Sequence, residues 1–192
     1  MVEKHVWIVL KENMVMDKVF IDTNIMIDVL LGRKKFLAQS SNIFQLADSG
    51  AIALYATALS FVNALYIGRK KLGKSEALKK LKLFHDFLNT APMDEEELAR
   101  AFMMDDKDFE DNLQYCSACS AGCNVIVPRN VKDFPKDGEV RVMMPSEFLD
   151  AFAEEAANDS ADINPLYLIF YWYICIKFQH QVWNKTDFSI VI

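Results

Sequence analysis

The sequence of 192 residues lacks an excess of positive charge, a secretory signal and an apolar run long enough to cross a membrane. It carries 21 basic and 27 acidic side chains, and its net charge is −6, which argues against a protein that binds nucleic acid through bulk charge. The apolar run over residues 166–176 has eleven residues, whereas a membrane span needs about 20. A nuclease that relies on a local basic patch and metal ions remains compatible with this composition.

The four cysteines do not have the spacing of a metal site. Cys116, Cys119 and Cys123 follow one another at helical intervals, but His85 and His180 are distant in sequence and no fourth ligand is nearby. Small buried residues that pack a helix on a sheet are the simpler interpretation. Free cysteines in a chain without a visible signal predict a reduced, cytoplasmic setting.

Composition predicts one main domain with an extension at each end. Apolar residues make up 52% of the chain, which is enough for a sizeable core. Residues 1–17 are predicted to be an N-terminal extension, residues 18–153 the domain, and residues 154–192 a tail outside the core fold. The tail begins polar and then becomes continuously apolar, unlike the rest of the chain. A segment that binds a partner or a membrane surface is the alternative interpretation of the tail.

Short apolar stretches alternate with amphipathic ones through the predicted domain. We expect Gly68 to end one helix and Ser75 to cap the next. This alternation predicts an α/β fold, with a central parallel sheet and helices on both faces. The expected strands are 18–23, 52–55, 124–127 and 140–143, and the expected helices are 24–31, 36–47, 60–67, 75–88, one starting at 94, 108–120 and 145–152.

The stretch from Val19 to Asn24 is the most informative local feature. Three apolar residues, typical of a buried parallel strand, run directly into Asp22, Thr23 and Asn24. Ligand-binding groups in open α/β sheets follow the carboxyl ends of strands, and a carboxylate there is a natural ligand for a hard divalent cation. The alternative is that Asp22 or Thr23 only caps the next helix.

Three later segments place polar groups at the same edge of a parallel sheet. Asn63 lies near a strand-to-helix turn, Asp111 lies near the start of a helix, and Asp133 follows a strand. Clustered carboxylates repel one another, so they persist where a cation neutralises them. The alternatives are that Asp108 and the acids after it only stabilise a helix start, and that Asp133 only shapes a loop.

Together these four segments resemble the PIN-domain ribonucleases, especially the toxins of bacterial toxin–antitoxin pairs, over about residues 18–150. The resemblance implies a three-layer PIN-like fold and hydrolysis of RNA phosphodiesters assisted by Mg²⁺ or Mn²⁺. Its implied partners are an RNA substrate, an antitoxin protein and a second copy of the chain. Its implied catalytic residues and metal ligands are Asp22, Asp111 and Asp133. Its implied supporting residues are Thr23, Asn24, Asn63, Glu110 and Asn130.

The chain departs from the pattern of this family at three positions. Asn63 stands where the family usually has Glu, Asn130 where it often has an acid, and Pro128 where it often has a hydroxyl residue. An amide can ligate through its carbonyl oxygen but supplies no charge and no base. A PIN-like domain with weak or lost catalysis, binding RNA or a protein, is therefore the alternative. Transfer of a phosphoryl group through an aspartyl-phosphate is disfavoured, because those enzymes generally need an acid at the place of Asn24.

Two basic clusters are candidates for contact with phosphates. The default interpretation of such clusters is a solvated surface, but in an acidic protein they are also the best candidates for binding RNA or an acidic partner. The clusters are Arg33, Lys34 and Lys35, and Arg69, Lys70 and Lys71.

Overall fold

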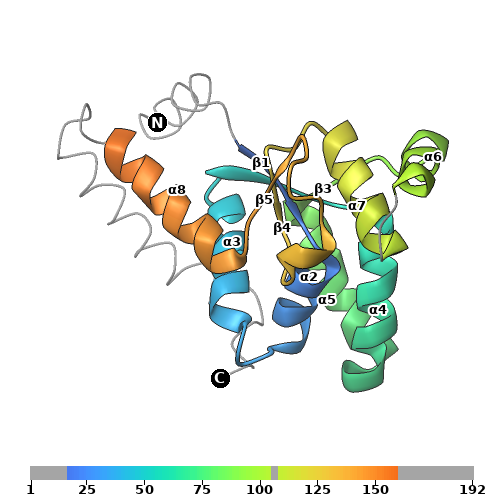
Figure 1. The fold of residues 1–192 in the computed structure, drawn as a ribbon. Coiled ribbons are helices and arrows are strands. Elements are labelled where there is room, and N and C mark those ends of the chain that lie inside the picture. Colours follow the sequence, from blue (N-terminus) through green and yellow to red (C-terminus); the bar gives the residue numbers. More distant parts are fainter. Residues whose placement is uncertain (1–16, 105–107, 160–192) are drawn as a thin grey trace, which may run out of the picture. The chain divides into compact units, whose positions relative to one another are not determined.

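The computed structural model describes residues 17–104 and 108–159, and the chain divides into two compact units, Met1–Ser146 and Glu147–Ile192. The first unit holds the sheet and most of the helices (Figure 1). The second contains most of α8 (Pro145–Asp159), in which the rings of Phe148 and Phe152 lie 6.2 Å apart. The predicted extension, apart from Asp17, and the apolar run at 166–176 lie outside the described residues, so the proposed domain limits remain predictions.

Five parallel strands form the sheet, in the order β3-β2-β1-β4-β5. In β1 the residues Val19, Phe20 and Ile21 are fully buried, as expected for a strand covered on both faces. The order reverses at β1, which has β2 on one side and β4 on the other. The strands are β1 (Asp17–Ile21), β2 (Ile52–Ala56), β3 (Leu88–Thr90), β4 (Val125–Val127) and β5 (Arg141–Val142).

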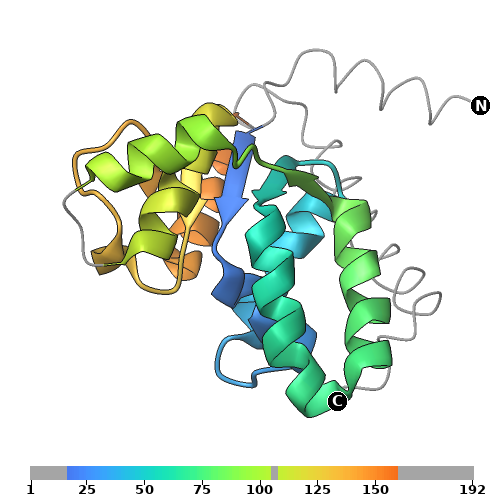
Figure 2. The ribbon, with the colours of Figure 1, turned by 90° about the vertical axis from the view of Figure 1, so that its right-hand side faces the viewer.

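Helices cover both faces of this sheet (Figure 2). The chain steps from β1 to β2 to β3 in one direction and then returns to β4 in the other, so right-handed crossovers place its helices on opposite faces. The prediction of a parallel α/β sheet between two helical layers is confirmed. One layer contains α2 (Thr23–Leu31), α3 (Leu37–Asp48), α4 (Ala58–Leu72) and α5 (Lys74–Phe87), and the other contains α6 (Glu95–Met103) and α7 (Phe109–Ser120).

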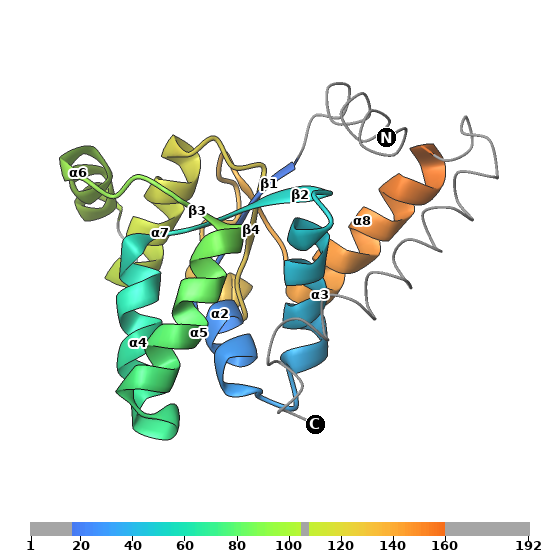
Figure 3. The same cartoon turned by 180° about the vertical axis from the view of Figure 1, so that it is seen from behind.

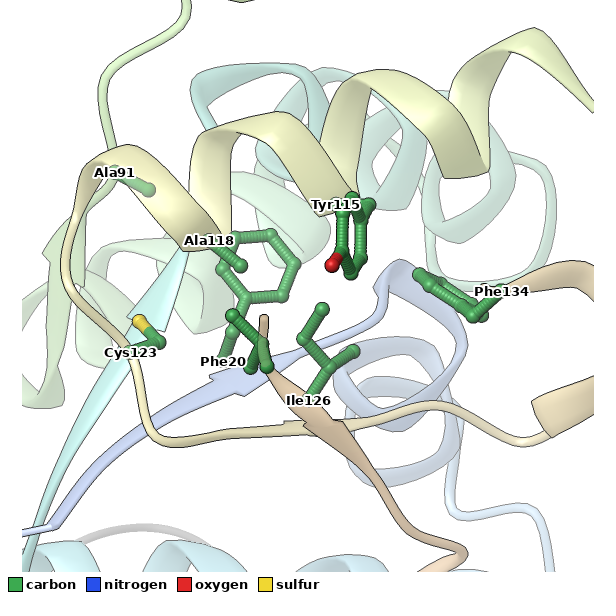
Figure 4. Packing of buried hydrophobic residues seen from close by; sticks show 8 residues of the cluster. Phe20, Ala91, Tyr115, Ala118, Cys123, Ile126 and Phe134 are labelled. Atoms are coloured by element: carbon green, nitrogen blue, oxygen red, sulfur yellow. The ribbon is translucent and has the colours of Figure 1, made fainter. Parts of the chain in front are cut away.

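The core beneath α7 fixes that helix on the sheet. Tyr115 and Ala118 of α7 pack against Phe20 of β1 and Ile126 of β4 (Figure 4). The Tyr115 hydroxyl also accepts a hydrogen bond from the Glu139 backbone N–H at 2.8 Å. This packing holds the N-terminal end of α7 close to the edge where β1 and β4 end.

The three described cysteines are free and pack in the core, as predicted. Cys116 and Cys119 belong to α7, but the helix ends at Ser120 and Cys123 therefore follows it in a loop. The helical interval between Cys119 and Cys123 therefore does not reflect a shared helix. Across residues 17–104 and 108–159, no helix has the length and apolar character needed to cross a membrane.

The structure corrects the predicted helix limits around Gly68. Helix α4 continues to Leu72, and α5 begins at Lys74 after Gly73, so Gly68 ends no helix and Ser75 caps none. The two helices lie side by side (Figure 3). A Cβ on Gly68 would lie 2.8 Å from Leu30 Cδ2, so glycine there allows α2 to approach α4 closely. This reason is tertiary and leaves no mark in the local sequence.

Candidate active site at the carboxyl edge of the sheet

Asp22 lies immediately after β1, where the chain enters α2. Its backbone N–H donates to the Val127 carbonyl of β4 at 3.2 Å, and its side chain is only 6% exposed. It occupies the position before α2 and makes no side-chain capping bond. Burial raises the pKa of Asp22, while hydrogen bonds from the side-chain amides of Asn24 and Gln114 and from the backbone N–H groups of Asn24 and Thr23 act in the opposite direction.

Asp111 lies in the first turn of α7 and is surrounded by other acids. Burial, and then the charges of Asp22, Asp108, Asp133 and Glu110, raise the pKa of Asp111 to about 7. A helix N-terminus normally favours a carboxylate, so burial together with the repulsion from these neighbours outweighs the helix dipole here. Two of the predicted acids, Asp22 and Asp133, therefore act on the third, Asp111, together with two further acids.

Asp108 caps the start of α7, as one of the alternative interpretations expected. Its Oδ1 accepts from the Glu110 backbone N–H at 2.9 Å, which caps α7. Thr57 caps α4 in the same way, because its Oγ1 accepts from the Ser60 backbone N–H at 3.1 Å. These two polar groups of the predicted segments organise helix starts.

Asparagine amides hold three of the carboxylates. Asn24 Nδ2 donates to Asp22 Oδ2 at 3.2 Å, and Asn63 Nδ2 donates to Glu110 Oε1 at 2.8 Å. Asn130 Nδ2 donates to Asp133 Oδ2, within the short 3-10 helix η1 (Val131–Asp133) and the residue before it. An amide donor orients a carboxylate without neutralising its charge, so each pair keeps its negative charge at the edge.

The side chain of Glu110 links its own helix, α7, to α4. Its Oε1 accepts from Asn63 of α4 and, at 3.3 Å, from Gln114 Nε2 one turn further along α7. Burial raises the pKa of Asp22, and a hydrogen bond from the side chain of Gln114 to its carboxylate opposes this rise. Two amides, one on α4 and one on α7, therefore fix the Glu110 carboxylate.

The donor set is consistent with a divalent cation. Asp22 is buried with acids around it, and the hydroxyl of Thr23, which is 5% exposed, has no hydrogen-bond partner. Excess negative charge and a buried oxygen without a partner are both relieved by a hard cation with its water shell. Within residues 17–104 and 108–159, no three Asp, Glu, His or Cys groups are already arranged to hold a metal, so the ligand assignment remains a prediction.

A buried ion-pair cluster around Asp28 was not anticipated from the sequence. The Asp28 carboxylate is fully buried and accepts from Arg33 Nη1 at 3.3 Å, Arg129 Nη1 at 3.2 Å and Ser40 Oγ at 3.3 Å. The Arg129 guanidinium also lies 3.8 Å from the centroid of the Phe36 ring. The cluster ties α2 and α3 to the loop after β4. An acid within the apolar run of α2, followed by Arg33, was the available signal.

The predicted basic clusters differ in their surroundings. Arg33 is committed to Asp28, whereas Lys34 and Lys35 are exposed. Arg69, Lys70 and Lys71 are exposed in the last turn of α4, where the helix dipole favours cations. Their contact with RNA remains a prediction.

The chain resembles known proteins both in sequence and in fold. A family model described as PIN domain matches residues 18–132. Ribonuclease VapC1 of Aquifex aeolicus (strain VF5) is 28% identical over 132 residues, which cover 65% of this chain and 89% of that protein. VapBC2 from Rickettsia felis, in a crystal structure bound to a DNA fragment from its promoter, has a TM-score of 0.52 at 14% identity. That match covers 66% of this chain and 98% of the solved chain, and it supports the fold.

The raised pKa of Asp111 predicts a pH dependence of stability in the metal-free protein. Its ordinary pKa is 3.8 and its folded pKa is about 7, so between these values the folded state holds a proton that the unfolded state lacks. This contribution to the free energy of unfolding therefore falls as pH rises through that window. Thermal unfolding in EDTA should show Asp111→Asn gaining stability over the original protein as pH rises. Parallel pH profiles for the two proteins would contradict the assignment.

Proposed function

Because the chain belongs to the PIN-domain family, we propose that it is a divalent-metal-dependent endoribonuclease that hydrolyses RNA phosphodiesters. The observation that supports this proposal is the crowding of acids around Asp111: burial, and then the charges of Asp22, Asp108, Asp133 and Glu110, raise its pKa to about 7. Carboxylates that repel one another in this way have their proton displaced by a cation.

Asp22, Asp111 and Asp133 would hold Mg²⁺ or Mn²⁺, with Glu110 as a further carboxylate. When bound, such a cation polarises the phosphate and lowers the pKa of an attacking water. Asp22 would supply the central ligand, because the backbone hydrogen bond from Asp22 to β4 fixes its position at the end of β1. The Thr23 hydroxyl would orient the water or the phosphate.

The remaining residues of the predicted site orient these ligands. Asn24 and Asn130 hold Asp22 and Asp133 through their amides, and Asn63 holds Glu110. Exposed cations would bind phosphates further along the RNA: Lys34, Lys35, Arg69, Lys70 and Lys71. Arg33 would contribute indirectly, since its guanidinium already pairs with Asp28.

We further propose that the chain acts as the toxin of a toxin–antitoxin pair, neutralised by an antitoxin protein, and that it forms a homodimer in the cytoplasm. The support is its resemblance to the toxins among PIN-domain ribonucleases and its similarity to a protein named Ribonuclease VapC1. The alternative, a PIN-like module that binds RNA or protein with weak or lost catalysis, is favoured by the neutral amides of Asn63 and Asn130.

Cleavage of single-stranded RNA in Mn²⁺ tests the proposed activity. Asp22→Asn keeps the shape of the side chain but removes the central negative ligand, so the cleavage rate should fall below about one hundredth of the original. Asp108→Asn is the matched control, because Asp108 caps α7, and it should retain most of the activity. Equal cleavage by Asp22→Asn and the original protein would contradict the site. RNA binding without any Mn²⁺-dependent cleavage by the original protein would favour the binding module.

Asn63 offers a second test, which measures metal affinity rather than activity. Asn63→Glu adds a carboxylate beside Glu110, where Asn63 now donates a hydrogen bond at 2.8 Å. At an effective dielectric constant near 20, unit charges about 4 Å apart interact by roughly 4 kcal/mol before desolvation. Even a quarter of that energy, acting on a divalent ion, should tighten Mn²⁺ binding about tenfold in calorimetric titration.

Asn63→Gln is the matched control for this test, because it keeps a neutral amide at the length of glutamate. Without metal, the Asn63→Glu protein should also be less stable than the Asn63→Gln protein. The glutamate cannot donate a hydrogen bond to Glu110, and its charge repels the Glu110 carboxylate. Identical Mn²⁺ affinities for Asn63→Glu and Asn63→Gln would place residue 63 outside the metal's surroundings.

A further inference from the structure

One face of α4 leads from the carboxylates to an exposed aromatic ring. Leu59, Asn63, Tyr66 and Lys70 follow one another at intervals of four, three and four residues, which places them on one side of the helix. Leu59 packs against the cluster formed by α6 and α7, and Asn63 donates to Glu110. From Asn63 to Lys70 the face extends roughly 10 Å along the helix axis.

Tyr66 is the distinctive residue of this face. Its side chain is 51% exposed, although Arg69 Cζ and Lys70 Nζ lie 4.8 and 4.4 Å from the centroid of its ring. The helix dipole accounts for cations in the last turn of α4. It does not account for a large exposed ring placed between those cations and the acidic edge.

We propose that this face of α4 binds single-stranded RNA, with a base stacked on Tyr66 and adjacent phosphates on Arg69 and Lys70. Aromatic rings that receive bases, beside cations that receive the backbone, are how proteins hold unpaired strands. The stacked base takes the place of one cation over the ring, and that cation then pairs with a phosphate. The inference rests on the proposed function, because it assigns the direction in which the strand approaches the carboxylates.

Charge complementarity and geometry select an unpaired RNA strand as the occupant. The chain as a whole carries a net charge of −6, so a polyanion is attracted to this surface only where cations gather, as they do in the last turn of α4. An acidic protein segment would satisfy the cations but would leave the Tyr66 ring without a matching group. The bases of a duplex are already stacked and paired, and an exposed ring on a helix cannot reach their faces.

Fluorescence anisotropy in EDTA, which prevents metal-dependent cleavage, tests the inference with a short labelled single-stranded RNA of mixed sequence. Tyr66→Ala should weaken binding roughly tenfold or more, whereas Tyr66→Phe should bind within about twofold of the original protein because the ring remains. Phe87→Ala is the matched control, since Phe87 is an exposed aromatic of α5, and it should bind as the original does.

Salt dependence separates the cations from the ring. Arg69→Gln and Lys70→Gln should each lower the slope of log affinity against log salt by about 0.7, the value for one phosphate of a single strand. Tyr66→Ala should weaken binding and leave that slope unchanged. A duplex of the same sequence should bind the original protein and Tyr66→Ala equally.

Two results would overturn the inference. One is equal binding of single-stranded RNA by Tyr66→Ala and the original protein. The other is displacement of the RNA by polyglutamate as effectively as by unlabelled RNA, which would make the face a general site for polyanions. Neither result depends on cleavage, so both remain distinguishable from a failure of the Asp22→Asn experiment, which concerns the proposed activity.

Discussion

The parallel pairing of β1 with β4 is the constraint on which the candidate site depends. Ile21 lies opposite Val127, and the N–H of Asp22 donates to the Val127 carbonyl at 3.2 Å. Both strands therefore end together, and Asp22 lies beside the start of the loop that leads from β4 to Asp133. A slip of one residue would turn every side chain of β1 to the opposite face, so the buried register of the sheet also fixes the position of the first acid.

The acids around Asp111 repel one another, and every main influence on its pKa raises it. Burial, and then the charges of Asp22, Asp108, Asp133 and Glu110, raise the pKa of Asp111 in α7 to about 7. The asparagines orient their carboxylates but leave the negative charge in place. Asn63 supplies no negative charge, but its hydrogen bond orients the Glu110 carboxylate. We infer that a cation completes the balance of charge.

Local sequence was sufficient for four of the five strands, because buried apolar residues and the polar residues that follow them occupy adjacent positions. It was insufficient where the cause is tertiary. The strand β3 went unrecognised, since only Leu88 of its three residues is buried and it follows α5 directly. Gly68 was misread because its reason is the nearness of Leu30. The sequence around α2 offers Asp28 and Arg33 as partners, but Arg129 lies 101 positions from Asp28 and no local pattern indicates that contact.

The central claim is that a divalent cation displaces the proton of Asp111 at this edge. Calorimetric titration with Mn²⁺ near neutral pH, in two buffers of different ionisation enthalpy, counts the protons released on binding. The account predicts binding with the release of a substantial fraction of one proton, up to about one at pH values below the pKa of Asp111, and a smaller release from Asp111→Asn. No detectable Mn²⁺ binding, or a proton release that is equal in the two proteins, would contradict it.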